Sequence, residues 1–250
     1  MKELPLSQIF EEAFERARGM DASSSVRLES IADSIRVASP AFAEVVDRVI
    51  ARFNLNGSGA TAPAVGDPMP PFMFPDDQGH LVTLEQLLAK GPLALSFQPG
   101  HWCPYCRLST NALAEAQCEV EPIGGQIVAI TPDLQHFATA LKSDAAAKPF
   151  PILTDVDNGY ALSLNLATFV GLEMQYFLKS GGWDISPLSS YLCLWPWPIP
   201  RRARLDVGLN FQTCTAPICR WSNIRPSLGR VFRSKWHVEQ VTGHPAEGFS

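Results

Sequence analysis

The sequence predicts an α/β fold with a mostly parallel sheet flanked by helices, and two observations support this. Short apolar runs bounded by glycine and proline, such as GPLALSF (91–97) and GGQIVAIT (124–131), are typical of strands buried on both faces. Segments suited to helices, 102–120 and 132–141, follow these runs. Strands that alternate with helices favour βαβ units and a parallel sheet.

Further elements complete this predicted domain. FMFPDDQGHLVTL (72–84) is typical of a short hairpin, because a polar turn separates two extended pieces. FPILTD (150–155) predicts a third buried strand, and residues 159–166 predict a short helix. We expect the domain to span 61–190.

An N-terminal helical extension with its linker is expected over 1–60. Apolar side chains recur there at helical spacing in two groups: Leu6, Ile9, Phe10, Ala13 and Phe14, then Phe42, Val45, Val46, Val49 and Ile50. Ser39 before Pro40 predicts a helix start with a serine cap and proline at the first helical position. The segment 54–71, rich in Gly, Pro and Ala, marks the domain boundary.

The last stretch, 191–250, predicts an irregular, poorly ordered C-terminal tail. It carries eight Lys and Arg residues but only three Asp and Glu. Because the whole chain has 20 basic and 25 acidic residues, residues 1–190 have twelve basic and twenty-two acidic ones. A basic, tryptophan-rich segment could also be a nucleic-acid or membrane-surface patch. Its lack of periodicity favours the tail.

Composition excludes several classes of protein. The 46% hydrophobic and 18% charged content of this 250-residue chain suits a globular protein, and the net charge of −5 argues against a nucleic-acid partner. The sequence contains no run of 18 apolar residues, which is the length that a membrane-spanning helix needs. The N-terminus carries acids within its apolar pattern, unlike a signal peptide, so we expect a cytoplasmic protein. Six cysteines are too few for a disulfide scaffold.

The candidate reactive centre is the pair Cys103 and Cys106 in WCPYC, directly after a buried strand and at a helix start. A cysteine in the first turn of a helix meets unpaired N–H groups and the positive end of the helix dipole, which favour the thiolate. Pro104 suits the start of the helix, and Cys106 lies close enough to close a disulfide. Cys103 would be the attacking sulfur and Cys106 the resolving one.

Two other interpretations of the pair stay open: two inert buried cysteines, or half of a zinc site. The second zinc ligands would be Cys214 and Cys219, or His101 and His136. We expect no metal and no cofactor.

Two cysteines outside the pair have weaker roles. Cys118 is expected to be a small core or surface residue. Cys193 is a weak candidate for a distant resolving cysteine.

The run from Gly66 to Gln117, which contains GDPMPPF and WCPYC, resembles the alkyl hydroperoxide reductase / thiol-specific antioxidant family. GGQIVAITPD and FPILTD follow in the family's order, and the resemblance extends to Trp183. It implies a thioredoxin-like fold and reduction of hydrogen peroxide or organic hydroperoxides through a cysteine sulfenic acid. Thioredoxin or a similar dithiol would return the electrons. Because many relatives form dimers, a homodimer is a further expectation.

Carried over from the family, Cys103 matches the attacked position and Cys106 the resolving one, with Trp102 and Pro104 as flanking residues. The chain departs from the family at Gly100, where relatives have Thr or Ser.

At Pro99 the similar branch has an arginine, and the closing strands of the fold are not recognisable in 191–250. These departures leave two alternatives: a dithiol-disulfide oxidoreductase of glutaredoxin or thioredoxin type, and a catalytically disabled relative.

Overall fold

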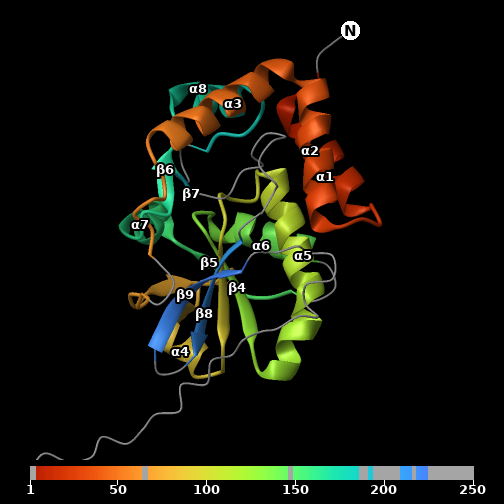
Figure 1. Cartoon of the computed structure of the whole chain (residues 1–250). Helices are drawn as coiled ribbons and strands as arrows, with labels where there is room; N and C mark the ends of the chain where they lie inside the picture. Colours follow the sequence, from red (N-terminus) through yellow and green to blue (C-terminus); the bar gives the residue numbers. More distant parts are fainter. Residues whose placement is uncertain are drawn as a thin grey trace, which may run out of the picture.

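The computed structural model describes residues 4–63, 67–145, 149–185, 191–193, 209–215 and 218–224. A five-stranded sheet in the order β5–β4–β3–β8–β9 forms its centre (Figure 1). Its strands are β3 (Leu93–Phe97), β4 (Gln126–Thr131), β5 (Ile152–Thr154), β8 (Leu209–Thr215) and β9 (Ile218–Ile224). β3, β4 and β5 run parallel, whereas β8 runs antiparallel to β3 and β9 antiparallel to β8.

Both faces of the parallel strands are covered, which confirms the prediction from their continuous apolar runs. On one face, Ala94, Ile127 and Ala129 pack against α5 (Pro104–Val120) and α6 (Gln135–Asp144). On the other face, alternate residues of the same strands pack against the short helices α4 (Leu84–Leu88) and α7 (Gly159–Ser163). The sheet thus forms the middle layer of an α/β/α domain.

The predicted hairpin is present as β1 (Met73–Pro75) paired with β2 (Leu81–Thr83). The Thr83 hydroxyl caps α4, and the Gln86 side chain bonds back to the Thr83 N–H, so the strand passes directly into the helix. Beyond α7, β6 (Ala167–Phe169) pairs antiparallel with β7 (Tyr191–Cys193), and α8 (Leu172–Ser180) lies between them in the chain.

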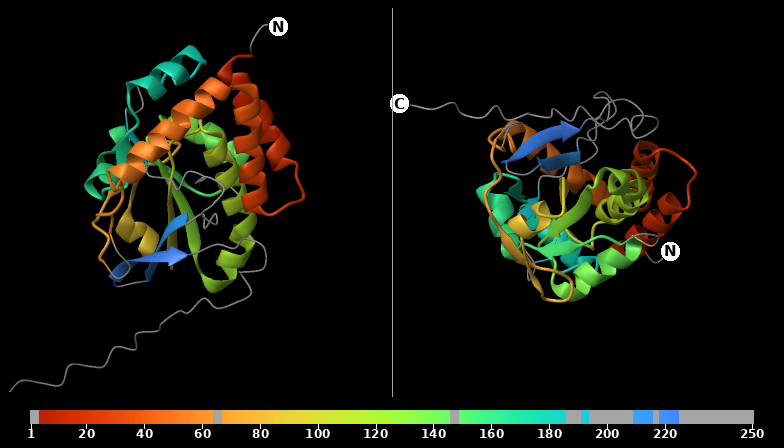
Figure 2. Two further views of the ribbon diagram at one scale, coloured as in Figure 1. Left: turned by 45° about the horizontal axis from the view of Figure 1, so that its top comes forward. Right: turned by 90° about the horizontal axis from the view of Figure 1, so that it is seen from below.

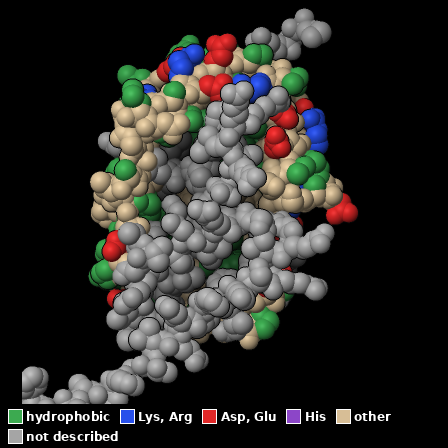
Figure 3. All heavy atoms as spheres, viewed as in Figure 1, with side chains coloured by type: hydrophobic (Ala, Val, Ile, Leu, Met, Phe, Trp, Pro, Cys, Tyr) green, Lys and Arg blue, Asp and Glu red, His purple; other side chains and the backbone are tan. Residues whose placement is uncertain are grey.

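Three helices form the N-terminal extension: α1 (Leu6–Arg18), α2 (Ser24–Ala38) and α3 (Pro40–Leu55). The last begins at Pro40 as predicted, although the Ser39 side chain makes no capping hydrogen bond. α1 and α2 lie beside α5, and α3 crosses the top of the domain next to α8 (Figures 1 and 2). Acidic and basic side chains are interspersed over the described part of these helices in Figure 3.

Two predicted helix starts are shifted in the structure. α5 begins at Pro104 and not at Trp102, because Cys103 has an extended backbone (φ −89°, ψ 115°) and serves as the cap residue. α6 begins at Gln135 and not at Pro132, because Leu134 is still extended.

Within the predicted tail, the described residues 191–193, 209–215 and 218–224 form strands, and the remainder lies outside the described residues. The division of the chain at 60 and 190 stays a prediction.

Candidate functional site

The two cysteines of WCPYC lie where the loop after β3 enters α5. Cys103 occupies the N-cap position of the helix, although its side chain makes no capping hydrogen bond, and Cys106 lies in the first turn. Both side chains are buried, with exposed fractions of 2% and 1%, and both are free thiols. The position fulfils the expected relation between the motif and the helix N-terminus, whose unpaired N–H groups favour negative charge.

The loop before the cysteines is held by polar contacts inside the domain. The Gln98 N–H donates to the Ile130 carbonyl (2.8 Å), and the Gln98 side chain accepts from the Thr110 hydroxyl of α5 (3.0 Å). The Cys103 N–H then donates to the Gly100 carbonyl (3.1 Å). These bonds tie the entrance of the motif to both β4 and α5.

Gly100, where relatives have Thr or Ser, has a backbone that requires glycine. Its φ of +140° lies in the left-handed region, and a Cβ there would lie 2.7 Å from Asp133 Oδ1 and 3.0 Å from Trp102 Cδ1. A side chain at position 100 would therefore have to displace a buried carboxyl.

Cys106 holds its proton firmly. Burial raises the pKa of its thiol well above the usual range, and a hydrogen bond with Cys103 and the charge of Cys103 act in the same direction. A hydrogen bond that raises this pKa has the Cys106 S–H as donor and the Cys103 sulfur as acceptor. The Gly100 N–H donates to the Cys106 sulfur and opposes the shift in part, whereas the charge of Asp133 adds to it.

Asp133 is a buried carboxyl that sequence reasoning missed. It follows β4 and is fully buried. Its Oδ2 accepts the His101 N–H (2.7 Å), and within the described part of the chain its Oδ1 has no hydrogen-bond partner. Burial raises the pKa of Asp133 to about 6, against the opposing effects of the His101 N–H, the Thr131 side chain and the two nearby histidines, His101 and His136.

A second missed feature is an ion network on the residue after Cys106. Arg107 donates to Asp144 (2.7 and 3.1 Å) and to both carboxylate oxygens of Glu11, and its guanidinium lies 3.9 Å from the centre of the Phe14 ring. His101 Nε2 lies 3.5 Å from Asp144 Oδ2. Although burial favours the neutral acid, hydrogen bonds from His101 and Arg107 lower the pKa of Asp144. The network links the motif to α6 and to α1.

The outer side of the motif is apolar. Cys103, Trp102 and Tyr105 belong to one buried cluster with residues of α1, α2, α3 and α8, such as Phe14 and Phe42. Burial raises the pKa of Tyr105, and the charge of Cys103 raises it further. Cys106 belongs to the same cluster, so three of the predicted site residues, Trp102, Cys103 and Cys106, pack against the N-terminal extension.

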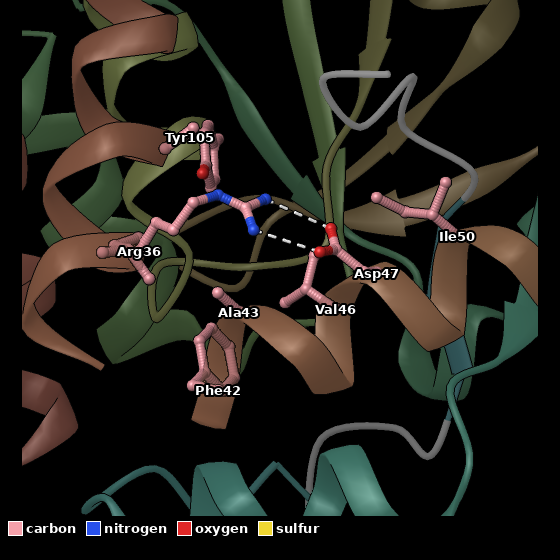
Figure 4. Close-up of a pocket in the computed structure, with 9 residues that line it drawn as sticks. Arg36, Phe42, Ala43, Val46, Asp47, Ile50 and Tyr105 are labelled. Atoms are coloured by element: carbon pink, nitrogen blue, oxygen red, sulfur yellow. Dashed lines mark hydrogen bonds and ion pairs between the residues drawn. The ribbon is translucent and has the colours of Figure 1, made fainter. Parts of the chain in front are cut away.

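A pocket opens between α2, α3 and Tyr105 (Figure 4). Its apolar lining comes from Ile35, Phe42, Val46 and Ile50 among others. At its side, Arg36 bridges to Asp47 with donor–acceptor distances of 3.1 and 3.2 Å. Tyr105, between the two cysteines in the sequence, is the motif's contribution to this pocket.

The remaining candidate residues lie apart from this centre or outside the described side chains. Cys118 is exposed on α5, where its thiol contacts the Glu115 carbonyl (3.1 Å). Cys214 and Cys219 face each other in the register of β8 and β9, and Cys193 pairs with Ala167, but their side chains are not described. Among the described residues, no group of three or more His, Cys, Asp or Glu side chains could hold a metal ion.

Comparison with protein families gives one match. The model of the AhpC/TSA family matches residues 65–175, which include β1 to β6 and the Cys-x-x-Cys motif. A comparison with curated proteins finds no match. None of the helices in the described part of the chain is both long and apolar enough to cross a membrane.

Solved structures of redox proteins are similar at low identity. Peroxidoxin BcpB of Mycobacterium tuberculosis is 24% identical, with a TM-score of 0.40 over 44% of this chain and 70% of that one. A yeast mitochondrial 1-Cys peroxiredoxin is 12% identical, with a TM-score of 0.44 over 68% and 73%. The thioredoxin domain of a thiol-disulfide oxidoreductase from Bacteroides vulgatus is 14% identical, with a TM-score of 0.38 over 65% and 90%.

The family match confirms the resemblance noted in the sequence, and the sheet order agrees with the fold that the resemblance implies. Residues 65–175, somewhat less than half of the chain, thus match the AhpC/TSA family model, and this match supports a thiol-dependent redox function on a thioredoxin-like fold.

Proposed function

We propose that the protein is a thiol peroxidase in which Cys103 attacks the peroxide and Cys106 resolves the product. The observation that supports this most is the position of Cys103 as the cap of α5, with the Cys106 thiol hydrogen-bonded to it. The helix N-terminus favours a thiolate at the cap, and the thiolate is the nucleophile that peroxides oxidise.

The proposed cycle has three balanced steps. The Cys103 thiolate attacks one peroxide oxygen, the O–O bond breaks, and the products are a sulfenic acid and an alcohol or water after protonation of the leaving oxygen. The Cys106 sulfur then attacks the Cys103 sulfur, so that an S–S bond forms, the S–O bond breaks and water leaves. Thioredoxin or a similar dithiol finally reduces the disulfide by thiol exchange and is itself oxidised.

The burial of both sulfur atoms limits which molecules can reach and react with them. With Cys103 2% exposed, a small peroxide needs only a narrow path, whereas a protein dithiol must bring its own sulfur into contact. Reduction by a protein partner therefore requires displacement of part of the apolar cover, which includes α1 to α3.

A second candidate function is dithiol-disulfide exchange on protein or glutathione disulfides. The hydrogen-bonded Cys-Pro-Tyr-Cys pair suits it, and it needs no cation or hydroxyl at Pro99 and Gly100 to activate a peroxide. Arg107 does not compensate for the missing cation, since Asp144 and Glu11 engage its guanidinium. A disabled relative is the third alternative.

We extend the leading proposal to a cytoplasmic protein that acts as a homodimer.

The test is peroxide consumption by the reduced protein with thioredoxin, thioredoxin reductase and NADPH. Cys103→Ser should abolish turnover, whereas Cys118→Ser, a change at an exposed thiol outside the centre, should leave it intact. Turnover of a disulfide substrate without peroxide turnover would favour the second candidate. Loss of both activities, with the thiols still titratable, would favour the disabled relative.

A further inference from the structure

The carboxyl of Asp133 is a buried ionisable group for which the proposed cycle has no use so far. It is fully buried at the end of β4, with Oδ2 bonded to the His101 N–H at 2.7 Å. Its Oδ1 is buried and, in the described part of the chain, without a hydrogen-bond partner. A buried polar oxygen without a partner is costly, so its retention calls for a reason in the chemistry of the site.

Gly100 places this oxygen next to the cysteines. A Cβ on Gly100 would lie 2.7 Å from Asp133 Oδ1, and the N–H of the same glycine donates to the Cys106 sulfur. The charge of Asp133 is felt at Cys106, where it makes loss of the proton harder. The carboxyl and the thiol therefore lie on two sides of one residue that has no side chain, and within the described part of the chain no hydrogen bond joins Asp133 Oδ1 to Cys106.

The resolving step needs a proton acceptor at this place. Cys106 must attack as a thiolate, but its burial and its bond to Cys103 keep it protonated. Within the described residues the Nδ1 nitrogen of His101 also lacks a partner, but it is Asp133 and Cys103 whose charges act on Cys106. Once Cys103 is a sulfenic acid, Asp133 is the remaining anion of that set.

We propose that Asp133 accepts the proton of Cys106 during the resolving step, an inference that rests on the proposed peroxidase cycle. The S–H bond of Cys106 breaks, its proton moves to the Asp133 carboxylate, and the Cys106 sulfur bonds to the Cys103 sulfur. The S–O bond of the sulfenic acid breaks, and the departing hydroxide takes a proton from solvent and leaves as water, while Asp133 afterwards releases to solvent the proton that it accepted. Reduction of the disulfide later returns a proton to Cys106.

The rate of resolution should then depend on the charge state of Asp133. The groups that face this carboxyl are His101 and His136, the Thr131 hydroxyl and Cys106. With a pKa of about 6, Asp133 is ionised at neutral pH and can accept a proton. The rate of disulfide formation should fall as pH decreases through about 6.

The experiment is a single turnover with one equivalent of hydrogen peroxide, quenched at intervals with dimedone and analysed by mass spectrometry. It compares the full-length wild type with Asp133→Asn and with Asp77→Asn, a little-exposed carboxyl paired with Lys142. Asp133→Asn should form the Cys103 sulfenic acid at a rate within about twofold of the wild type. Its disulfide formation should slow about a hundredfold, the usual contribution of a positioned acid or base, and lose the change near pH 6. Asp77→Asn should match the wild type in both steps.

Disulfide formation in Asp133→Asn at the wild-type rate, with the same pH profile, would overturn the proposal. If that variant does not fold, the wild-type pH profile decides: a resolving rate independent of pH between 5 and 7 would overturn the proposal as well. A wild type whose Cys103 is never oxidised by peroxide fails at the first step, which identifies a failure of the proposed function and removes the inference with it.

Discussion

The cysteine pair has two unlike sides, and their difference explains what each part of the molecule contributes. On the outer side, Cys103, Tyr105 and Cys106 share one cluster with apolar side chains of the N-terminal helices. On the inner side, the Cys106 sulfur accepts the Gly100 N–H, and the charge of the Asp133 carboxyl near the end of the sheet acts on it. Apolar cover is non-directional and can be separated and restored, whereas the inner side is fixed by hydrogen bonds to the sheet.

This comparison teaches where access and where proton transfer are controlled. Damage to the outer side should lower stability and expose the thiols. Damage to the inner side should change how stability and resolution depend on pH, with little effect on exposure.

Phe14→Ala breaks the outer side and should have the largest effect. Phe14 is fully buried, and Arg107 lies over its ring. Loss of a buried phenylalanine should lower the free energy of unfolding by about 3–5 kcal/mol. Urea denaturation measures this, and Cys103 should react faster with Ellman's reagent in the variant. Val37→Ala, at a position 83% exposed, should change stability by less than about 0.5 kcal/mol. Equal effects of the two substitutions would contradict the assigned cover.

Arg107→Met tests the ion network that links the motif to α6 and α1. It leaves Asp144 buried without its guanidinium partner, which should cost about 3 kcal/mol. Arg48→Met removes an exposed pair with Glu173 and should cost less than about 1 kcal/mol. Thermal or urea unfolding of both variants checks the ranking, and a larger loss at Arg48 would reverse it.

Asp133→Asn tests the inner side by changing how the free energy of unfolding depends on pH. In the folded protein the pKa of Asp133 rises from 3.8 to about 6, so the folded state holds this proton more tightly than the unfolded chain. The wild type should therefore lose up to about 3 kcal/mol as pH rises from about 4 to 7, and the asparagine variant should lack this loss. Unfolding free energies at pH 4 and pH 7 provide the test. A wild-type-minus-variant difference that does not change with pH would show that the carboxyl is not held neutral by burial.

Glu11→Gln should have the smallest effect. Glu11 is half exposed, with a side-chain exposed fraction of 52%, so its pair with Arg107 is screened by solvent. We expect a loss below about 1 kcal/mol that shrinks further at high salt. Unfolding at low and high ionic strength measures this, and a loss as large as that of Arg107→Met would mean that α1 is held chiefly by charge.

The sequence predicted those parts of the fold that local pattern determines. The apolar runs at 91–97 and 124–131 became β3 and β4, since a strand covered on both faces must be continuously apolar. Pro40 and Pro104 marked helix starts because proline suits the first helical turn. β8 and β9 were not recognised: β8 pairs with β3, more than a hundred positions earlier in the chain, and β9 joins the sheet only through its pairing with β8.

The sequence predicted the cysteine motif of the candidate site but not the charged side chains that surround it. Cys103 and Cys106 were found from spacing and from the strand before them. The contacts of Arg107 with Glu11 and Asp144 join residues 96 and 37 positions apart, which no local pattern reveals. Asp133 did carry a signal, because a polar residue that follows a buried parallel strand lies at the edge where sites form.

The most direct test of the account is to identify the oxidised sulfur after one equivalent of hydrogen peroxide, by mass spectrometry of peptide digests. We predict a Cys103–Cys106 disulfide in the wild type and a dimedone adduct on Cys103 in Cys106→Ser. An adduct on Cys118, or a first oxidation at Cys106 in Cys103→Ser at the wild-type rate, would contradict the assignment of Cys103 as the attacking sulfur.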